Sequence, residues 1–243
     1  MTEFIYLHGF ASGPGSNKAK AFKKRFDELG ISIHVPDLQQ GDFENLTLTG
    51  QIELVQGIID KKKDKSFGLI GSSMGGYLAS LIAQTRESVQ ALFLMAPGFN
   101  FLNRWRKKLD ISKSTDELIP VFHYRYNKEV CLNTYLFRDA ETWECLPLDR
   151  KIPTFIVHGL HDETIDIEES RNFVREKSFC LLKELDSDHG LLSCIDSIIE
   201  DSLEFFNQQR IKALQDKKSG KSKKFKNNGG LSSYVTHLRG RKQ

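Results

Sequence analysis

Short apolar segments alternate with helix-like segments along most of this chain, and no other feature constrains its fold as strongly. Most of the apolar segments are continuous runs, which is typical of strands buried on both faces of a parallel sheet. The sequence therefore predicts an α/β fold with a mostly parallel sheet of about six strands, flanked by helices and built from βαβ units. The expected strands are 3–8, 31–36, 66–71, 89–95, 153–158 and 179–185.

The segments between these strands have the periodicity of helices. In residues 16–29 apolar side chains recur at helical spacing, with Ser16 placed to cap the N-terminus and Gly30 to end the helix. Residues 48–62 carry an apolar stripe of the same kind. Further helices are expected at 74–85, 166–176 and 190–208.

The interval from 98 to 151 interrupts this alternation. It has no clear strand and is dense in aromatic residues. An insertion of this length in a compact domain is usually functional or has structure of its own. We expect a small helical lid whose aromatic residues either line an acyl pocket or pack the lid onto the body. They are Phe99, Phe101, Trp105, Phe122, Tyr124, Tyr126, Tyr135, Phe137 and Trp143.

Charge divides the chain into a body and a tail. The whole chain has 35 Lys and Arg against 32 Asp and Glu. Residues 211–243 contain ten of the basic residues and one acidic residue, Asp216, which leaves 25 basic and 31 acidic residues upstream. Because the last segment is also poor in apolar residues, we expect residues 1–209 to form the folded domain and 210–243 to be a disordered basic tail.

Several classes of protein do not fit the composition. No apolar run approaches the roughly 20 residues that cross a membrane, and the start MTEFIYLHGF lacks the features of a signal peptide. A cytoplasmic protein is therefore expected. The four cysteines form no C-x-x-C pair, so we expect free thiols rather than a zinc or redox motif.

Residues 71–76, here called the nucleophile turn, have the sequence GSSMGG and match the pattern G-x-S-x-G at Ser73. A strand-like run precedes the turn and a helix-like run follows it, which is the arrangement that exposes a nucleophilic serine at a sheet edge. A glycine-rich helix cap without chemistry and a phosphate-binding turn are the alternatives. The sequence contains neither G-x-x-x-x-G-K-[ST] nor G-x-G-x-x-G at this point.

A serine hydroxyl needs a histidine base that a carboxylate orients, in the chain order serine, acid, histidine. His189 follows the last expected strand, and Asp162 follows the strand before it, so both belong to the sheet edge of Ser73. The other downstream histidines are His123 in the lid and His237 in the tail, neither of which is expected to be well fixed, and His158 and His161 at a strand end. The competing acids are Asp166, Asp186 and Asp188.

The same chemistry needs two donors for an oxyanion. One is expected to be the backbone N–H of Met74, and the other that of Phe10, in the loop that follows the first strand. His8 in this loop is expected to have a structural role.

These motifs resemble those of the α/β-hydrolase family. The pieces YLHGF, GSSMGG, HGLHDETID and DHG occur in its order across almost all of residues 1–209. The start YLHGFASGPGSNKAKAF is most similar to the small YqiA/YcfP-type esterases. The resemblance implies an α/β-hydrolase fold trimmed of its antiparallel edge strands, and hydrolysis of carboxylic esters or thioesters by Ser73, Asp162 and His189.

Two classes of function follow. The first is a serine esterase or thioesterase that acts on a small acyl ester or thioester; peptidase action on this fold ranks lower. The second is a non-catalytic or moonlighting binder of nucleic acid or of an acidic partner through the basic tail, where a single aromatic residue, Phe225, offers little stacking. No motif implies a cofactor, and His158 with His161 is a weak case for zinc.

Overall fold

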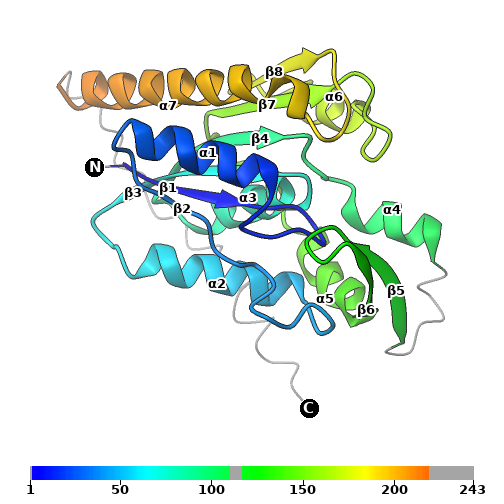
Figure 1. Cartoon of the computed structure of the whole chain (residues 1–243). Helices are drawn as coiled ribbons and strands as arrows, with labels where there is room; N and C mark the ends of the chain where they lie inside the picture. Colours follow the sequence, from blue (N-terminus) through cyan, green and yellow to red (C-terminus); the bar gives the residue numbers. More distant parts are fainter. Residues whose placement is uncertain (1, 110–116, 219–243) are drawn as a thin grey trace.

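The computed structural model describes residues 2–109 and 117–218, and its core is a six-stranded sheet (Figure 1). The strand order is β2-β1-β3-β4-β7-β8, and every neighbouring pair is parallel. All six strands are at the predicted places, which confirms the α/β fold, although β2 is only two residues long. The strands are β1 (Thr2–Leu7), β2 (Ile33–His34), β3 (Ser66–Ser72), β4 (Val89–Met95), β7 (Thr154–Gly159) and β8 (Cys180–Leu185).

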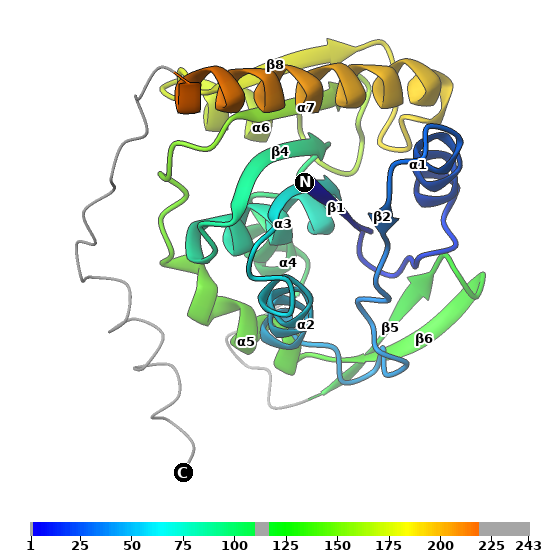
Figure 2. The same ribbon diagram turned by 90° about the vertical axis from the view of Figure 1, so that its left-hand side faces the viewer.

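Helices cover both faces of the sheet. Helices α1 (Asn17–Glu28) and α7 (Ile195–Lys218) pack against each other on one face, while α2 (Leu48–Asp60) and α3 (Met74–Thr85) lie on the other (Figures 1 and 2). Successive side chains of a strand point to opposite faces. Tyr6 of β1 accordingly belongs to the core under α1 and α7, whereas Ile5 and Leu7 belong to the core under α2 and α3.

Local capping explains where the first two major helices begin. Ser16 has an extended backbone, and its hydroxyl accepts a hydrogen bond from the Ala19 N–H, as predicted for this cap. Thr47 caps α2 in the same way, through the Gly50 N–H. The ends of α1 and α2 are therefore largely encoded in the local sequence.

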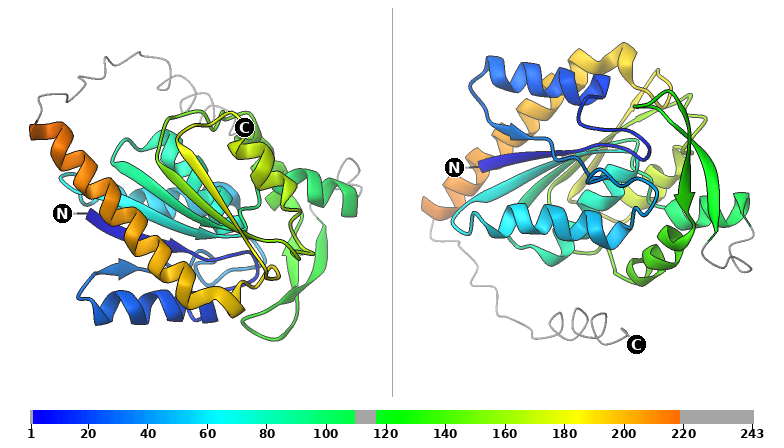
Figure 3. Two further views of the ribbon diagram at one scale, coloured as in Figure 1. Left: turned by 90° about the horizontal axis from the view of Figure 1, so that it is seen from above. Right: turned by 60° about the horizontal axis from the view of Figure 1, so that its bottom comes forward.

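The lid is partly helical, and it contains two strands where no clear strand was expected. It contains α4 (Phe101–Lys108) and α5 (Tyr135–Glu144), but between them lies an antiparallel hairpin of β5 (Leu118–His123) and β6 (Lys128–Asn133). Figure 3 shows this hairpin, in green, beyond the ends of the central strands. Half-buried Ile119 and Val121 alternate with exposed Leu118 and Phe122, so each strand is only half covered and its apolar pattern is weak.

The C-terminal boundary also differs from the prediction. Helix α7 continues to Lys218, so residues 210–218 belong to a helix rather than to a disordered tail that begins at 210. Residues 219–243, which hold most of the basic tail, lie outside the described residues, and nucleic acid binding through them stays a prediction. None of the described helices is long and apolar enough to cross a membrane.

Candidate active site

Ser73 lies where β3 ends and α3 begins, at the edge formed by the carboxyl ends of the parallel strands (Figure 1). Its backbone has φ 55° and ψ −121°, a conformation that few non-glycine residues adopt and that typically costs about 1–3 kcal/mol. The Ser73 N–H donates to the Met95 carbonyl at 2.9 Å, and the Ser73 carbonyl accepts from the Gly98 N–H at 3.0 Å. Backbone bonds to the last residue of β4 and to the segment after it therefore hold the strained residue in place.

Close backbone packing also fixes the nucleophile turn. A Cβ atom on Gly75 would overlap the carbonyl oxygens of Leu7 and His8, so only glycine lets α3 start this close to the end of β1. This contact brings the loop after β1 beside Ser73. A Cβ on Gly9 would lie 3.4 Å from the Ser73 Cβ and 3.9 Å from its Oγ.

The loop from His8 to Ser16, here called the oxyanion loop, begins with an anchored histidine. Leu38 N–H donates to His8 Nε2 at 3.1 Å, and His8 Nδ1 lies 2.9 Å from the Gly9 carbonyl oxygen. Burial lowers the pKa of His8, which keeps the ring neutral and suited to this accepting role. His8 is thus structural, as predicted, and it fixes the residues that precede Phe10.

The structure brings Asp162 and His189 together. Asp162 lies in the loop of residues 160–167 after β7, here called the acid loop, and His189 lies in the loop of residues 186–191 after β8, here called the base loop. His189 Nδ1 is 2.7 Å from Asp162 Oδ2. Within the described residues this chain of hydrogen bonds ends at His189, because Ser73 Oγ has no hydrogen-bond partner there.

Asp162 is a fully buried carboxylate with four donors around it. His189 Nδ1 and His158 Nε2 approach Oδ2 at 2.7 and 3.2 Å, and the backbone N–H groups of Thr164 and Ile165 donate to Oδ1 at 2.9 and 2.8 Å. Burial alone would raise the pKa of Asp162. The hydrogen bonds from His158, His189 and Ile165 outweigh burial and hold this pKa well below its usual range, so the carboxylate stays charged beside His189.

His158 is a site residue that the sequence reasoning missed as a partner of the acid. Its ring is fully buried, with Nδ1 2.7 Å from Ser170 Oγ and Nε2 3.0 Å from the Ile165 carbonyl oxygen. Because Nε2 faces a carbonyl and a carboxylate, it carries the proton, and Ser170 donates to Nδ1. The signal was present as a histidine at a strand end four residues before the acid.

The competing acids each have another partner. Asp166 Oδ1 accepts from the Glu168 N–H near the start of α6 (Glu168–Val174), the helix-terminal role expected for it. Asp186 pairs with His161 at 2.8 Å on the surface. Asp188 Oδ1 accepts from the Leu191 N–H within the base loop. Asp162 is the one of these four acids that bonds to the His189 ring.

The remaining histidines stand apart from this pair. His123 was expected to be loosely held in the lid, but it is fully buried, with Nε2 3.1 Å from Gln39 Oε1 and its ring stacked on Tyr126. His237 lies outside the described residues. Among the described residues no group of three or more His, Cys, Asp or Glu side chains is placed to hold a metal ion.

The lid closes over this edge from two sides. The Tyr124 N–H, just after β5, donates to the Ala11 carbonyl of the oxyanion loop at 2.9 Å. On the other side, Arg104 of α4 forms an ion pair with the nearly buried Glu169 of α6. Trp105 of α4 packs edge-on against Phe10, with 5.6 Å between ring centroids. The lid is therefore fastened to both the oxyanion loop and the element that follows the acid loop.

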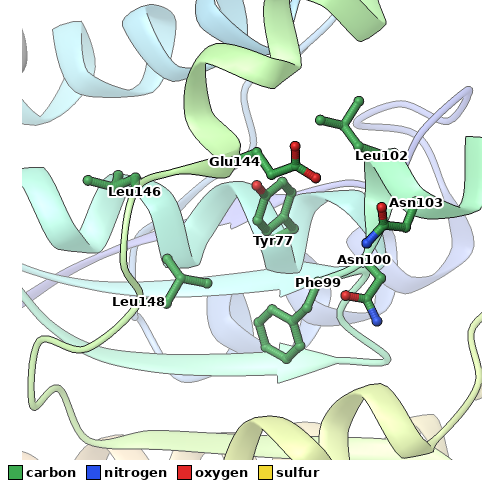
Figure 4. A pocket seen from close by; sticks show the side chains of 8 residues that line it. All are labelled: Tyr77, Phe99, Asn100, Leu102, Asn103, Glu144, Leu146 and Leu148. Atoms are coloured by element: carbon green, nitrogen blue, oxygen red, sulfur yellow. The ribbon is translucent and has the colours of Figure 1, made fainter. Parts of the chain in front are cut away.

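Two hollows lie along the lid. A cavity of about 210 Å³ lies between α3 and the two ends of the lid, and Tyr77, one turn after Ser73, lines it together with Glu144 (Figure 4). Phe99 and three leucines give it an apolar side, while Asn100 and Asn103 give it a polar one. A wider groove of about 800 Å³ runs between α4 and the acid loop, and Asp162 is among the residues that line it.

The lid aromatics divide between the two roles considered for them. Phe99 lines the cavity and stacks on Phe173 with 4.0 Å between ring centroids. Trp105 and Phe137 pack against each other, and Trp143 Nε1 donates to Thr49 of α2. Phe101 joins the core, so more of these side chains pack the lid onto the body than line the cavity. The remaining four have neither role fully, because they are exposed: Phe122, Tyr124, Tyr126 and Tyr135.

Comparison with known proteins places the chain in a family. The model of an uncharacterised protein family, UPF0227, matches residues 3–207. The chain belongs to this family. A curated relative, the putative esterase/lipase 2 of Mycoplasma pneumoniae, is 39% identical over 100 residues, which are 39% of this chain and 37% of that protein. The match thus spans well under half of the relative's length.

Solved structures show the fold of this UPF0227 member. Est1E from Butyrivibrio proteoclasticus, solved with bound ferulic acid, has a TM-score of 0.75 at 21% identity, over 87% of this chain and 90% of that one. Mouse alpha/beta hydrolase domain-containing protein 10 has a TM-score of 0.69 at 21% identity, over 85% and 90% of the two chains. The expected α/β-hydrolase fold is thereby confirmed.

Proposed function

We propose that this protein is a serine hydrolase that cleaves carboxylic esters or thioesters through an acyl-enzyme on Ser73. The observation that carries the proposal is the 2.7 Å hydrogen bond between Asp162 and His189, on the sheet edge where Ser73 occupies a strained strand-to-helix turn. A serine alone is a weak nucleophile, and an oriented imidazole is what activates it. The curated relatives named as putative esterases or lipases support this class of reaction.

In the proposed reaction, His189 Nε2 takes the proton from Ser73 Oγ as the oxygen attacks the acyl carbon. Asp162, which stays ionised, holds the imidazole through Nδ1 and stabilises the imidazolium that forms. The imidazolium then gives the proton to the departing alkoxide or thiolate, which leaves the acyl group on Ser73. Water, deprotonated by His189, hydrolyses this ester and restores the serine.

The oxyanion that forms during both steps needs two donors. We assign them to the backbone N–H groups of Met74 and Phe10. Met74 is the first residue of α3, where N–H groups have no acceptor within the helix, and the helix dipole there favours negative charge. Phe10 follows Gly9, whose backbone already lies against the Ser73 side chain.

The cavity beside Tyr77 is proposed as the place for the acyl group. Its volume of about 210 Å³ and its mixture of apolar and polar lining suit a compact acyl chain rather than a long aliphatic one. Est1E was solved with ferulic acid, a compact aromatic acid, which is consistent with such a pocket in a relative of the same fold.

The test is hydrolysis of p-nitrophenyl esters and acyl thioesters of graded chain length, with Ser73→Ala as the control. We expect turnover by the parent, a maximum at short acyl chains and loss of turnover in the variant. A fluorophosphonate probe should label the parent at Ser73 and leave Ser73→Ala unlabelled. Equal turnover by parent and variant would refute the catalytic assignment.

A further inference from the structure

Lys18, in the first turn of α1, lies behind the base loop and is not used by the reaction described above. Its Nζ donates to the backbone carbonyl oxygen of His189 at 3.4 Å. The residue is half-buried, unlike the exposed lysines further along the same helix. Helix α1 and the base loop are more than 150 positions apart in the sequence, and this bond links them at the residue proposed as the base.

The charged groups around Lys18 come from three elements. The ammonium of Lys18 belongs to α1, and Asp162 belongs to the acid loop. The base loop contributes Asp188 and His189. The buried His158 lies behind Asp162. Burial lowers the pKa of Lys18 to about 8, although Asp162 and Asp188 both favour its charged form. Burying an ammonium costs free energy unless hydrogen bonds and opposite charges compensate for the lost hydration.

The start of the base loop is bonded to the acid loop, because the His161 N–H donates to the Ser187 carbonyl at 3.0 Å. The His189 side chain is held by Asp162, and Lys18 bonds to the His189 backbone carbonyl. Leu191 has a left-handed backbone with φ 56°, and the Leu191 N–H bonds to Asp188 within the loop. Ser187 Oγ and Ser193 Oγ are 2.9 Å apart at the loop's margins. The bond from Lys18 therefore joins the backbone of His189 itself to a rigid helix of the body.

We propose that Lys18 is a positioning residue for the proposed hydrolase reaction. It ties the base loop to α1, so that the His189 ring stays on Asp162 and faces Ser73. The inference rests on the proposed function. A protonated Lys18 makes a charge-assisted bond to the carbonyl, and deprotonation weakens that bond. Turnover by the parent should accordingly decline as the pH rises through the range in which Lys18 loses its charge.

The experiment compares Lys18→Met, Lys18→Arg and the parent, with Lys24→Met as the matched control. Lys24 lies on the same helix, and its side chain is 81% exposed. In Lys18→Met we expect kcat to fall roughly 10- to 100-fold, the range for removing a hydrogen bond to a charged group, with KM nearly unchanged. The decline of kcat near pH 8 should disappear in this variant. Lys18→Arg should recover much of kcat and also lack the decline, because arginine stays charged.

Thermal unfolding is measured for every variant, so that a misfolded protein is recognised. Fluorophosphonate labelling of Ser73 is measured as well, and it should slow together with kcat in Lys18→Met. If Lys18→Met labels and unfolds like the parent and keeps its kcat and pH profile, the positioning role is wrong. If Lys18→Met and Lys24→Met lose kcat equally, the effect is one of general charge and the role is also wrong. Failure of the proposed function is a separate outcome, because Ser73→Ala would then retain full turnover.

Discussion

The nucleophile turn and the acid loop lie on one sheet edge, yet different interactions hold them. At Ser73 the fixing contacts are backbone bonds to Met95 and Gly98 and the approach of Gly75 to β1. At Asp162 they are hydrogen bonds from two imidazoles and two backbone N–H groups to one buried carboxylate.

Because of this difference, the nucleophile turn and the acid loop should be sensitive to different kinds of change. A turn fixed by backbone packing has no titrating group, so pH has little direct influence on its geometry, but added atoms damage it. A loop fixed by a buried carboxylate depends on its ionisation and on each donor that stabilises the charge. Steric changes should therefore disturb the nucleophile turn, and changes of charge or hydrogen bonding should disturb the acid loop.

The largest expected effect is that of Asp162→Asn. The amide keeps the shape but cannot stabilise an imidazolium, and it favours the wrong tautomer of His189, so kcat should fall by a factor on the order of 10⁴. Ester hydrolysis at pH 7 measures this. Asp186→Asn is the control, because that acid lies on the surface with His161. Comparable losses in both variants would contradict the assignment of the acid.

The next effect tests whether Phe10 contributes to catalysis through its backbone N–H or through its ring. Phe10→Pro removes the N–H and should lower kcat by about 10²–10³ if that N–H stabilises the oxyanion. Phe10→Ala keeps the N–H and loses only packing on Phe43 and Trp105, so its kcat should stay within about tenfold of the parent. Thermal unfolding of the two variants would reveal a disturbed fold. A proline variant as active as the alanine variant would exclude this donor.

A third change addresses the sterics of the nucleophile turn directly. Gly75→Ala places a Cβ against the carbonyls of Leu7 and His8 and should lower the free energy of unfolding by about 3 kcal/mol. Gly57→Ala in α2 meets nothing within 4 Å and should raise it by up to about 1 kcal/mol. Urea unfolding at pH 7 compares the two. If Gly75→Ala is as stable as Gly57→Ala, close packing against Leu7 and His8 does not constrain the nucleophile turn.

The smallest effect concerns the acid loop and pH. The pKa of Asp162 is lower in the folded state than in the unfolded state, so its stabilising contribution is present above about pH 4 and is lost as the pH falls through the folded pKa. His158→Leu removes a donor to the charged carboxylate and should lower the free energy of unfolding by about 1–3 kcal/mol at pH 6. That deficit should shrink as the pH falls below about 4.

Ser170→Ala is the matched control for this pH dependence. It removes the bond to His158 Nδ1 while leaving His158 Nε2 beside Asp162. Its loss of stability should be nearly independent of pH between about 3 and 6, because no bond to the carboxylate is removed. A pH-independent deficit in His158→Leu would show that His158 stabilises the fold by packing alone.

Much of the fold was predictable because its signals are local. Continuous apolar runs identified all six strands of the main sheet, and Ser16 identified the start of α1. The hairpin of β5 and β6 was not predicted, since its strands are half exposed and the proline at position 120 weakens the strand signal of one of them. The extension of α7 to Lys218 was missed because polar residues dominate its last turns.

The candidate site divides in a similar way. Motif order and strand ends were enough to choose Ser73, Asp162 and His189 as candidates, and the structure brings the last two into contact. The contact of His158 with Asp162, only four residues ahead, was overlooked, whereas the contact of Lys18 with His189 joins segments far apart in the sequence. The three-dimensional structure shows that His158 lies against Asp162 and that Lys18 lies against His189.

The parallel α/β architecture and the sheet edge that holds the candidate site residues could be predicted without coordinates, since both follow from periodicity and from the succession of strands along the chain. The tertiary structure decided which of four acids meets His189, how Ser73 is strained and how the lid is fastened. Those outcomes depend on distances between segments far apart in the chain, such as Gly75 against Leu7 and His8, and sequence spacing does not encode them.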